Sequence, residues 1–243
     1  LIEGDMRVLS RRDVSGISQH GGTILHTARC PEFKTEVGRQ HALTNLRANG
    51  IEGLIVIGGD GTFAGARELS KLGVPTIGVP GTIDNDLAYT DYCIGFDTAI
   101  NTVVSSISKI RDTMDSHGRI GVIEVMGRNC GDIAMKTAMA TGAEMLIVPE
   151  VEWDVDEVAA RLNCLIEQGN TRATLVISEH CWDNMKPFDW RKFLNDNGKT
   201  VYPGEPISAE YLASILKRKC GGAEVRSTVI GYTQRGAQPT AQD

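Results

Sequence analysis

The stretch "GGDGTFAGARELSKLGVPTIGVPGTIDND", residues 58–86, decides the fold class of this chain. It joins the end of the apolar run "EGLIVIGGD" (52–60), which predicts a buried strand, to the run "VPTIGVPGT" (74–82), which predicts another. Residues 63–73 between them have the pattern of a helix closed by a glycine. A strand, a helix and a strand connected in this way cross over with a right hand, so the two strands are expected to be parallel.

Three aspartates stand at the ends of these strands, where a structural segment has little need for charge. Asp60 follows the first strand, and Asp84 and Asp86 follow the second. Ligands of open α/β sheets bind along the edge that the carboxyl ends form. Asp is also common in turns and helix caps, but clustered carboxylates repel one another unless a cation or a shared proton compensates. Chemistry therefore explains the cluster better than folding does.

The residues around Asp60 suit an anionic ligand and its metal. Gly58, Gly59 and Gly61 permit a tight turn that brings backbone N–H groups against a phosphate. The helix that begins near Thr62 points its positive end at the same place. Asp60 can support Mg²⁺ directly or through water. The motif matches neither the Walker loop nor the dinucleotide-binding fingerprint, so its chemistry needs support from the rest of the chain.

Short β-branched runs alternate with longer amphipathic stretches along the remaining sequence, as in an α/β protein with parallel strands. Further strands are predicted at 119–128, 145–150, 173–180 and 226–235. Further helices are predicted at 98–114, 155–169 and 208–222. Residues 181–207 are less regular and are expected to form a surface excursion.

The composition is that of a soluble globular protein, with 243 residues of which 41% are hydrophobic and 23% charged. The net charge of −6 gives no general attraction to nucleic acid or acidic membranes. No apolar run reaches the roughly 18 residues that a membrane span needs. The six cysteines, at positions 30, 93, 130, 164, 181 and 220, have no metal-ligand spacing and are expected to be reduced thiols in the cytoplasm.

Four motifs in fixed order resemble those of the ATP-dependent 6-phosphofructokinases. They are "GGDGT" (58–62), "PGTIDND" (80–86), "GFDTA" (95–99) and "EVMGRNCGDIA" (124–134). The first is shared with NAD kinases and lipid kinases, whereas "PGTIDND" followed by "MGR" is specific. The resemblance covers essentially the whole chain and implies phosphoryl transfer from MgATP to the 1-hydroxyl of fructose 6-phosphate in glycolysis.

The resemblance also implies the architecture: two Rossmann-like three-layer α/β/α domains with mainly parallel sheets. Residues 1–96 would form the nucleotide-binding domain, and residues 97–233 the fructose 6-phosphate domain. Residues 234–243 would begin a return segment to the first domain. Family members start earlier, with a strand and a glycine-rich phosphate loop, and continue past Asp243 with several helices. The chain is therefore expected to be a fragment, poorly stable and nearly inactive when expressed alone.

The resemblance assigns roles to the acidic cluster. Asp84 would be the general base that takes the proton from the sugar hydroxyl, and Asp60 would bind magnesium. Thr82 and Asp86 would position phosphate, metal and base. Arg128 would stabilise charge on the transferring phosphoryl group, a task suited to a permanently charged fork of donors. Such transfers depend on positioning and charge stabilisation more than on covalent catalysis.

Two binding sets are carried over in the same way. The ATP set is Arg29, Cys30, Gly59, Asp60, Gly61 and Thr62. The sugar-phosphate set is Thr82, Asp84, Arg119, Met126, Gly127, Arg128, Glu179, Arg226, Tyr232 and Arg235. Glu179 would accept hydrogen bonds from sugar hydroxyls. Tyr232 departs from the family, where many members have histidine, and is expected to alter affinity without loss of function.

The phosphoryl donor is a choice between ATP and pyrophosphate. Pyrophosphate-dependent relatives resemble "GGDD" and "PKTIDND", in which an acid and a lysine fill the space that adenosine and its α-phosphate need. This chain has Gly61 and Gly81 at those places, which favours ATP. Two further alternatives are an inactive chain that only binds nucleotide or sugar phosphate, and a lipid or NAD kinase, which lacks "PGTIDND".

Bacterial relatives are often controlled by ADP and phosphoenolpyruvate at a basic site between subunits. Arg11, Arg111 and Glu144 match family positions there. The lysines that usually help to bind the effector phosphates are replaced by Gln168, Asn170 and Thr171, with Arg172 the nearby basic residue. Losing several charge-assisted contacts is expected to leave control by these effectors weak or absent.

Strand spacing separates two arginines from the proposed site. Arg119 and Arg128 lie nine residues apart around one predicted strand, and Arg226 and Arg235 have the same spacing around another. At about 3.3 Å per residue, each pair would be separated by roughly 30 Å, beyond the reach of one sugar phosphate. Solvated surface arginines are the plain alternative. The resemblance implies instead that Arg119 and Arg226 act in the neighbouring subunit of a homo-oligomer, most simply a tetramer.

Overall fold

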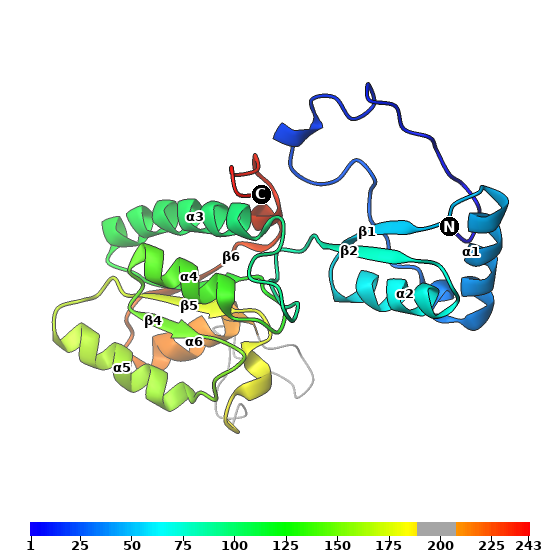
Figure 1. The fold of residues 1–243 in the computed structure, drawn as a ribbon. Helices are drawn as coiled ribbons and strands as arrows, with labels where there is room; N and C mark the ends of the chain where they lie inside the picture. The colour runs from blue at the N-terminus through cyan, green and yellow to red at the C-terminus, as the bar shows by residue number, and fades with distance from the viewer. Residues whose placement is uncertain (189–207) are drawn as a thin grey trace. The chain divides into compact units, whose positions relative to one another are not determined.

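The protein is described by a computed structural model that covers residues 1–188 and 208–243. The chain folds into two compact units. Unit 1 comprises Leu1–Asp97 together with Ala237–Asp243, and unit 2 comprises Thr98–Gly236. Figure 1 shows the course of the chain through both. No helix in the described part of the chain is long and apolar enough to cross a membrane.

Unit 1 is built around one βαβ motif. Strand β1 (Leu54–Gly58) is followed by helix α2 (Asp60–Lys71) and strand β2 (Thr76–Pro80), and the strands pair in parallel from Leu54↔Thr76 to Gly58↔Pro80. Helix α1 (Glu36–Ala48) precedes them and begins at Thr35, whose side chain accepts a hydrogen bond from Gly38 N. Apolar side chains of the helices and the following turn form a small core: Leu43, Leu46, Leu69 and Val74.

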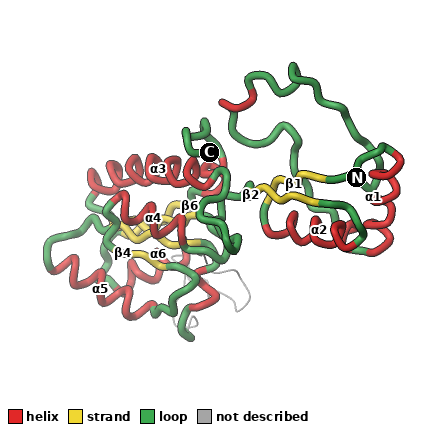
Figure 2. The backbone as a smooth tube through the Cα atoms, in the orientation of Figure 1, coloured by secondary structure: helices red, strands yellow, loops and turns green. Residues whose placement is uncertain are grey.

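The segment before α1 is mostly loop, as Figure 2 shows. Its two short 3₁₀ helices are η1 (Ile17–Gln19) and η2 (Pro31–Lys34). In the two-stranded sheet, side chains alternate between faces, and the face opposite the helices carries exposed Ile55, Ile57 and Ile77. Unit 1 therefore has two layers, because its helices cover only one face of the sheet.

Unit 2 has a four-stranded sheet in the order β4-β5-β3-β6, and every pair is parallel. The strands are β3 (Ile120–Val125), β4 (Met145–Ile147), β5 (Thr174–Ser178) and β6 (Val225–Val229). The helices are α3 (Phe96–His117), which starts at the boundary of the units, α4 (Asp132–Thr141), α5 (Val155–Glu167) and α6 (Ala209–Lys219). Two 3₁₀ helices follow strands, η3 (Cys181–Asn184) after β5 and η5 (Gly231–Arg235) after β6.

The sheet of unit 2 lies between two layers of helices, with α3 and α4 on one face and α5 and α6 on the other (Figure 1). The strands of such a sheet are buried on both faces, and all five residues of β5 are buried. The larger core lies on the side of α5 and α6. It includes Ile120, Val122, Leu162, Leu175, Ile177, Leu212 and Ile215. The α/β class and the parallel sheets predicted from the sequence are confirmed.

Two helices were not predicted from the sequence, and several predicted strands are too long. The strand predicted at 119–128 ends at Val125, and the one predicted at 145–150 ends at Ile147. Helices α1 and α4 have weaker amphipathic patterns than α2 or α5, and nothing in their periodicity separated them from loops. The strand predicted at 226–235 ends at Val229, because Ile230 adopts helical angles and starts η5. Part of the excursion predicted at 181–207 lies outside the described residues.

Candidate active site

The two acidic motifs of unit 1 meet at the carboxyl edge of its sheet. Gly81 N donates to Gly58 O at 3.0 Å, one step beyond the last paired residues of β1 and β2. A Cβ atom placed on Gly59 would lie 3.4 Å from Thr82 Cβ, so "GGDGT" and "PGTIDND" are in van der Waals range. The parallel register thus brings together what the sequence separates by about twenty residues.

Asp60 is the first residue of α2, and its carboxylate is in the positively polarised first turn. The helix begins after Gly59, whose carbonyl accepts from Thr62 N and Phe63 N at 3.0 and 3.1 Å. A Cβ atom at Gly61 would have no atom within 4 Å. The start of α2 is therefore exposed at Asp60, Gly61 and Thr62 and has open space beside a carboxylate, which suits a phosphate chain with its cation.

The segment after β2 folds back on itself and holds Asp84 and Asp86 half-buried. Asp84 N donates to Thr82 Oγ1 at 3.2 Å. Asn85, which has φ 55°, accepts from Cys93 N at 3.0 Å through Oδ1. Burial raises the pKa of the Cys93 thiol, and the charges of Asp86 and Asp84 raise it further. Both carboxylates are therefore close enough to one buried thiol to repel its negative charge.

Arg29 and Cys30 are exposed in the loop before η2. No hydrogen bond or ion pair joins the Arg29 side chain to the described residues around Asp60. The structure therefore brings the glycine and aspartate motifs together but does not bring Arg29 to them. The role of Arg29 and Cys30 in ATP binding stays a prediction.

Apart from Arg119 and Arg226, the predicted sugar-site residues of unit 2 follow the carboxyl ends of its strands. Strand β3 ends at Val125 and is followed by Met126, Gly127 and Arg128, while β5 is followed by Glu179. Glu179 Oε1 accepts from Gly127 N at 3.1 Å and from Arg128 N at 2.7 Å. The carboxylate predicted to meet sugar hydroxyls therefore also holds the backbone of the neighbouring loop.

That loop has an unusual backbone. Gly127 has φ 154°, and a Cβ atom there would lie 2.5 Å from Cys130 O, so only glycine fits. Arg128 has φ 53°, in the left-handed region that non-glycine residues rarely adopt. The two N–H bonds to Glu179 compensate for this strain, and strain of this kind is concentrated at functional sites.

The turn after β6 carries Tyr232 and Arg235, two further residues of the predicted sugar set. Tyr232 is exposed, and the Arg235 guanidinium lies over its ring at 5.3 Å from the centroid. Gln234 between them points inward, is 1% exposed, and accepts from Met126 N at 3.0 Å. Sequence analysis missed Gln234; its place between Tyr232 and Arg235 in "GYTQRG" was the available signal.

Glu124 is a second acidic residue that sequence analysis missed. It lies on β3, and its Oε2 accepts from Ala209 N at the start of α6 at 3.2 Å. Burial raises the pKa of its carboxyl group, the hydrogen bond from Ala209 lowers it, and the charge of Glu179 raises it. An acid that faces inward from a strand interior was hidden in the apolar run "RIGVIEVMGR".

Arg119 and Arg226 lie together at the opposite edge of the sheet. Strands β3 and β6 pair with Ile120 beside Val225 and Gly121 beside Arg226, so both arginines are at amino ends. Arg226 is ion-paired with Glu224 at 3.0 Å. The spacing of roughly 30 Å expected for each pair is too long, because β3 ends at Val125 and residues 231–235 are helical. Their separation to opposite edges stands.

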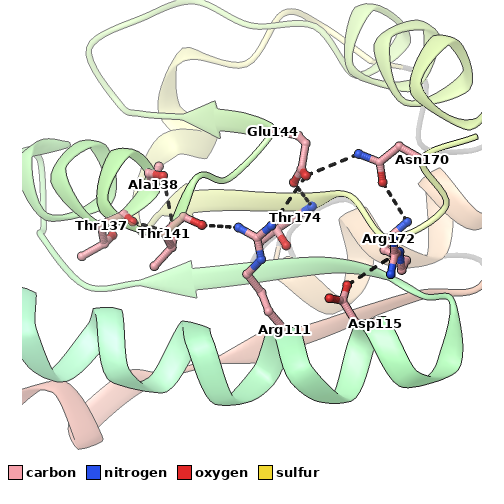
Figure 3. A network of polar contacts seen from close by, with 9 residues as sticks. All are labelled: Arg111, Asp115, Thr137, Ala138, Thr141, Glu144, Asn170, Arg172 and Thr174. Carbon is pink, nitrogen blue, oxygen red and sulfur yellow. Dashed lines mark hydrogen bonds and ion pairs between the residues drawn. The ribbon is translucent and has the colours of Figure 1, made fainter. Parts of the chain in front are cut away.

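Apart from Thr171, the predicted effector residues of unit 2 line a polar cavity of about 320 Å³. The lining residues are Arg111, Asp115, Glu144, Gln168, Gly169, Asn170 and Arg172. Figure 3 shows Arg111, Asp115, Glu144, Asn170 and Arg172 in one network of polar contacts. Arg111 Nη1 donates to Thr141 O, and Arg111 Nη2 lies 3.7 Å from Glu144 Oε1. Glu144 Oε2 accepts from Thr174 N at 2.6 Å.

The charges around this cavity balance. Arg172 Nε lies 3.9 Å from Asp115, and Arg111 is opposed by Glu144, so two cations face two carboxylates. Arg11, the third matching position, is in unit 1 and exposed. A cavity with paired charges attracts an anionic phosphate less than an array of lysines does.

Magnesium would have to be held by few protein groups. Among the described residues, no three His, Cys, Asp or Glu side chains cluster closely enough to hold a metal. Mg²⁺ commonly keeps several waters and binds one or two carboxylates together with substrate phosphates. The exposed Asp60 beside open space fits that pattern.

Comparisons with known proteins give a consistent result. Residues 1–243 match the family described as phosphofructokinase. The chain is 48% identical over its whole length to the ATP-dependent 6-phosphofructokinase of Clostridium tetani, of which it covers 68%. It is also 48% identical to the enzyme of the same name from Clostridioides difficile, again covering 68%.

Solved structures agree. The fold matches a structure of phosphofructokinase from Saccharomyces cerevisiae with a TM-score of 0.77 and 29% identity, over 96% of this chain and 32% of that one. A structure of Pichia pastoris phosphofructokinase in the T-state matches with a TM-score of 0.77 and 30% identity, over 96% of this chain and 25% of that one. The chain therefore spans about a third or less of these yeast chains.

Proposed function

The chain belongs to the phosphofructokinase family, its function is the ATP-dependent phosphorylation of fructose 6-phosphate in glycolysis, and we propose how its residues divide this work. The observation that supports the division most directly is the meeting of Gly59 and Thr82, which places Asp60 and Asp84 at one sheet edge. As a glycolytic enzyme, the protein is expected in the cytoplasm.

ATP binds through unit 1. The exposed N–H groups at the start of α2 receive phosphate oxygens, and Gly59, Gly61 and Thr62 line their path. Asp60 would hold Mg²⁺, which would neutralise negative charge on the phosphate chain. Arg29 and Cys30 complete the nucleotide set. The open space at Gly61 supports ATP over pyrophosphate, because no side chain fills the place of the α-phosphate.

Asp84 acts as the general base. It accepts the proton of the 1-hydroxyl of fructose 6-phosphate while that oxygen forms a bond to the γ-phosphorus and the bond to the leaving ADP oxygen breaks. Its backbone N–H is held by Thr82 Oγ1, which fixes the turn that presents the carboxylate. Asp86 would help to position the phosphate, the metal and the base. Arg128 stabilises the charge on the transferring group.

Fructose 6-phosphate binds through unit 2. Met126, Gly127 and Glu179 contact the sugar, and Tyr232 and Arg235 contact the phosphate end. Arg119 and Arg226, at the other edge of the same sheet, contribute to a neighbouring subunit of a homotetramer. The predicted nucleotide and sugar domains thus correspond in this proposal to unit 1 and unit 2.

The experiment that tests the role of Asp84 uses Asp84→Asn in the full-length protein. Removing the base is expected to lower kcat by about 10²–10⁴-fold, while the KM for fructose 6-phosphate and the melting temperature change little. Rates are measured with saturating MgATP, and Asp86→Asn serves as the comparison, since it changes the same charge two residues away. A kcat within threefold of wild type for Asp84→Asn would contradict the assignment.

A further inference from the structure

Gln234 has a polar side chain in a buried environment, and neither packing nor surface solubility explains a polar residue there. Its side chain is 1% exposed, on a short turn whose neighbours Tyr232, Thr233 and Arg235 are exposed. Burying an amide costs free energy unless both its oxygen and its nitrogen are hydrogen-bonded. Oε1 accepts from Met126 N at 3.0 Å, but Nε2 is buried with no partner among the described residues. A residue chosen for packing alone would be Leu or Met here.

The bond to Met126 replaces a missing rung of the sheet. Along the β3–β6 ladder, Ile120 N donates to Glu224 O and Ile230 N donates to Glu124 O, so the next donor on β3 is Met126 N. A continuing β6 would offer it the carbonyl of Ile230. The chain turns into η5 at that residue instead, and Gln234 supplies an oxygen in place of the backbone.

This bond joins the two segments that carry the sugar-site residues of unit 2. On one side are Met126 and the strained Gly127 and Arg128. On the other side, η5 turns Tyr232 and Arg235 outward and stacks them on each other. Glu179 fixes the far side of the first segment through Gly127 N and Arg128 N. Gln234 is therefore the described side-chain link from the end of β3 to η5.

We propose that Gln234 is a positioning residue for fructose 6-phosphate: its amide oxygen holds the end of β3 at the correct distance from η5. The residues on both sides then face the same sugar phosphate. This inference rests on the proposed function of unit 2. It assigns Gln234 no contact with the reacting atoms, so its loss acts on sugar binding and leaves ATP binding in unit 1 unchanged.

The test is Gln234→Met in the full-length protein, which keeps the length of the side chain and removes the acceptor. The KM for fructose 6-phosphate is expected to rise about tenfold or more, with the KM for MgATP within about twofold of wild type. Gln234→Glu keeps an oxygen acceptor and is expected to stay within about threefold for both substrates. Thr174→Val is the control, because Thr174 Oγ1 is also buried without a described partner but lies at the opposite sheet edge.

The outcomes separate clearly. A KM for fructose 6-phosphate within twofold of wild type in Gln234→Met, with only the melting temperature lowered, overturns the proposal, and so do equal rises in both KM values. If Gln234→Met does not fold, Gln234→Glu decides: a threefold or smaller change supports the proposal, and a tenfold rise overturns it. Absence of turnover in the wild type would contradict the proposed function itself.

Discussion

At the scale of single residues, the candidate site is defined by what glycine permits and what carboxylates hold. Gly127 is required by its backbone and by the nearby Cys130 carbonyl, whereas Gly61 is required by neither, because the space around it is open. The glycine motifs and aspartates were predictable from the sequence because their types and spacing are distinctive. Glu179 holding two N–H groups and Gln234 replacing a ladder bond were not, because both depend on residues about 50 and 108 positions away.

Gly61→Asp tests the steric argument for ATP. A carboxylate at this position has room and suits the first turn of α2, so folding is expected to be normal. It would place negative charge beside the phosphate chain, and kcat/KM for ATP is expected to fall at least about tenfold. Gly61→Ala is the matched control for size without charge and is expected to stay within a few-fold. Unchanged ATP kinetics in Gly61→Asp would contradict the proposal that the phosphate chain of ATP lies beside Gly61.

At the scale of elements, periodicity predicted strands and helices that have one clear apolar face or a continuous apolar run. It overran β6, because it passed over Gly231, which has a left-handed φ of 54° and follows Ile230 at the point where the chain turns into η5. It missed α4, because the contrast between the apolar and polar faces of this helix is weak. The buried residues of α4 are Ile133, Ala134, Thr137 and Ala138. The polar cavity between α3, α4 and the loops before β4 and β5 illustrates the same limit. The sequence predicted Arg111, Glu144, Gln168, Asn170 and Arg172 here, but neither Asp115 nor the contacts among these side chains.

The paired charges of this cavity predict a weak response to ADP and phosphoenolpyruvate. Arg111 and Arg172 each face a carboxylate, so an incoming phosphate must compete with Glu144 and Asp115 for them. The rate against fructose 6-phosphate concentration is expected to be unchanged by ADP or phosphoenolpyruvate at micromolar levels. The double variant Gln168→Lys and Asn170→Lys is the comparison, since it adds two cations. A sigmoidal wild-type curve that micromolar ADP makes hyperbolic would contradict the prediction.

At the scale of the whole molecule, the arginines at the amino ends of β3 and β6 argue for an assembly. Arg119 and Arg226 lie at the edge opposite Met126 and Glu179, although all four belong to the predicted sugar set. One small ligand cannot contact both the amino and the carboxyl edge of a single sheet, because the length of strands β3 and β6 separates the two edges. A neighbouring subunit resolves this, as each subunit would lend its amino-edge arginines to another.

Mixing two inactive variants of the full-length protein tests this sharing. Asp84→Asn removes the base and Arg119→Ala removes a phosphate contact, so each homo-oligomer is expected to be nearly inactive. In some mixed oligomers, one active site combines an intact Asp84 from one subunit with an intact Arg119 from its neighbour. A fraction of wild-type activity should then return. Mixing is verified by native mass spectrometry, and Asp84→Asn mixed with Thr82→Ala is the control, because both changes fall on the same side. Mixed oligomers without recovered activity would make the assignment in trans wrong.

The phosphoryl donor is tested by the rate at which the full-length protein forms fructose 1,6-bisphosphate, with either MgATP or magnesium pyrophosphate. Product is expected with ATP, and none above background with pyrophosphate. The reasons are the open space at Gly61 and the whole-length similarity to ATP-dependent relatives. Product from pyrophosphate alone, or from neither donor with a well-folded protein, would contradict it.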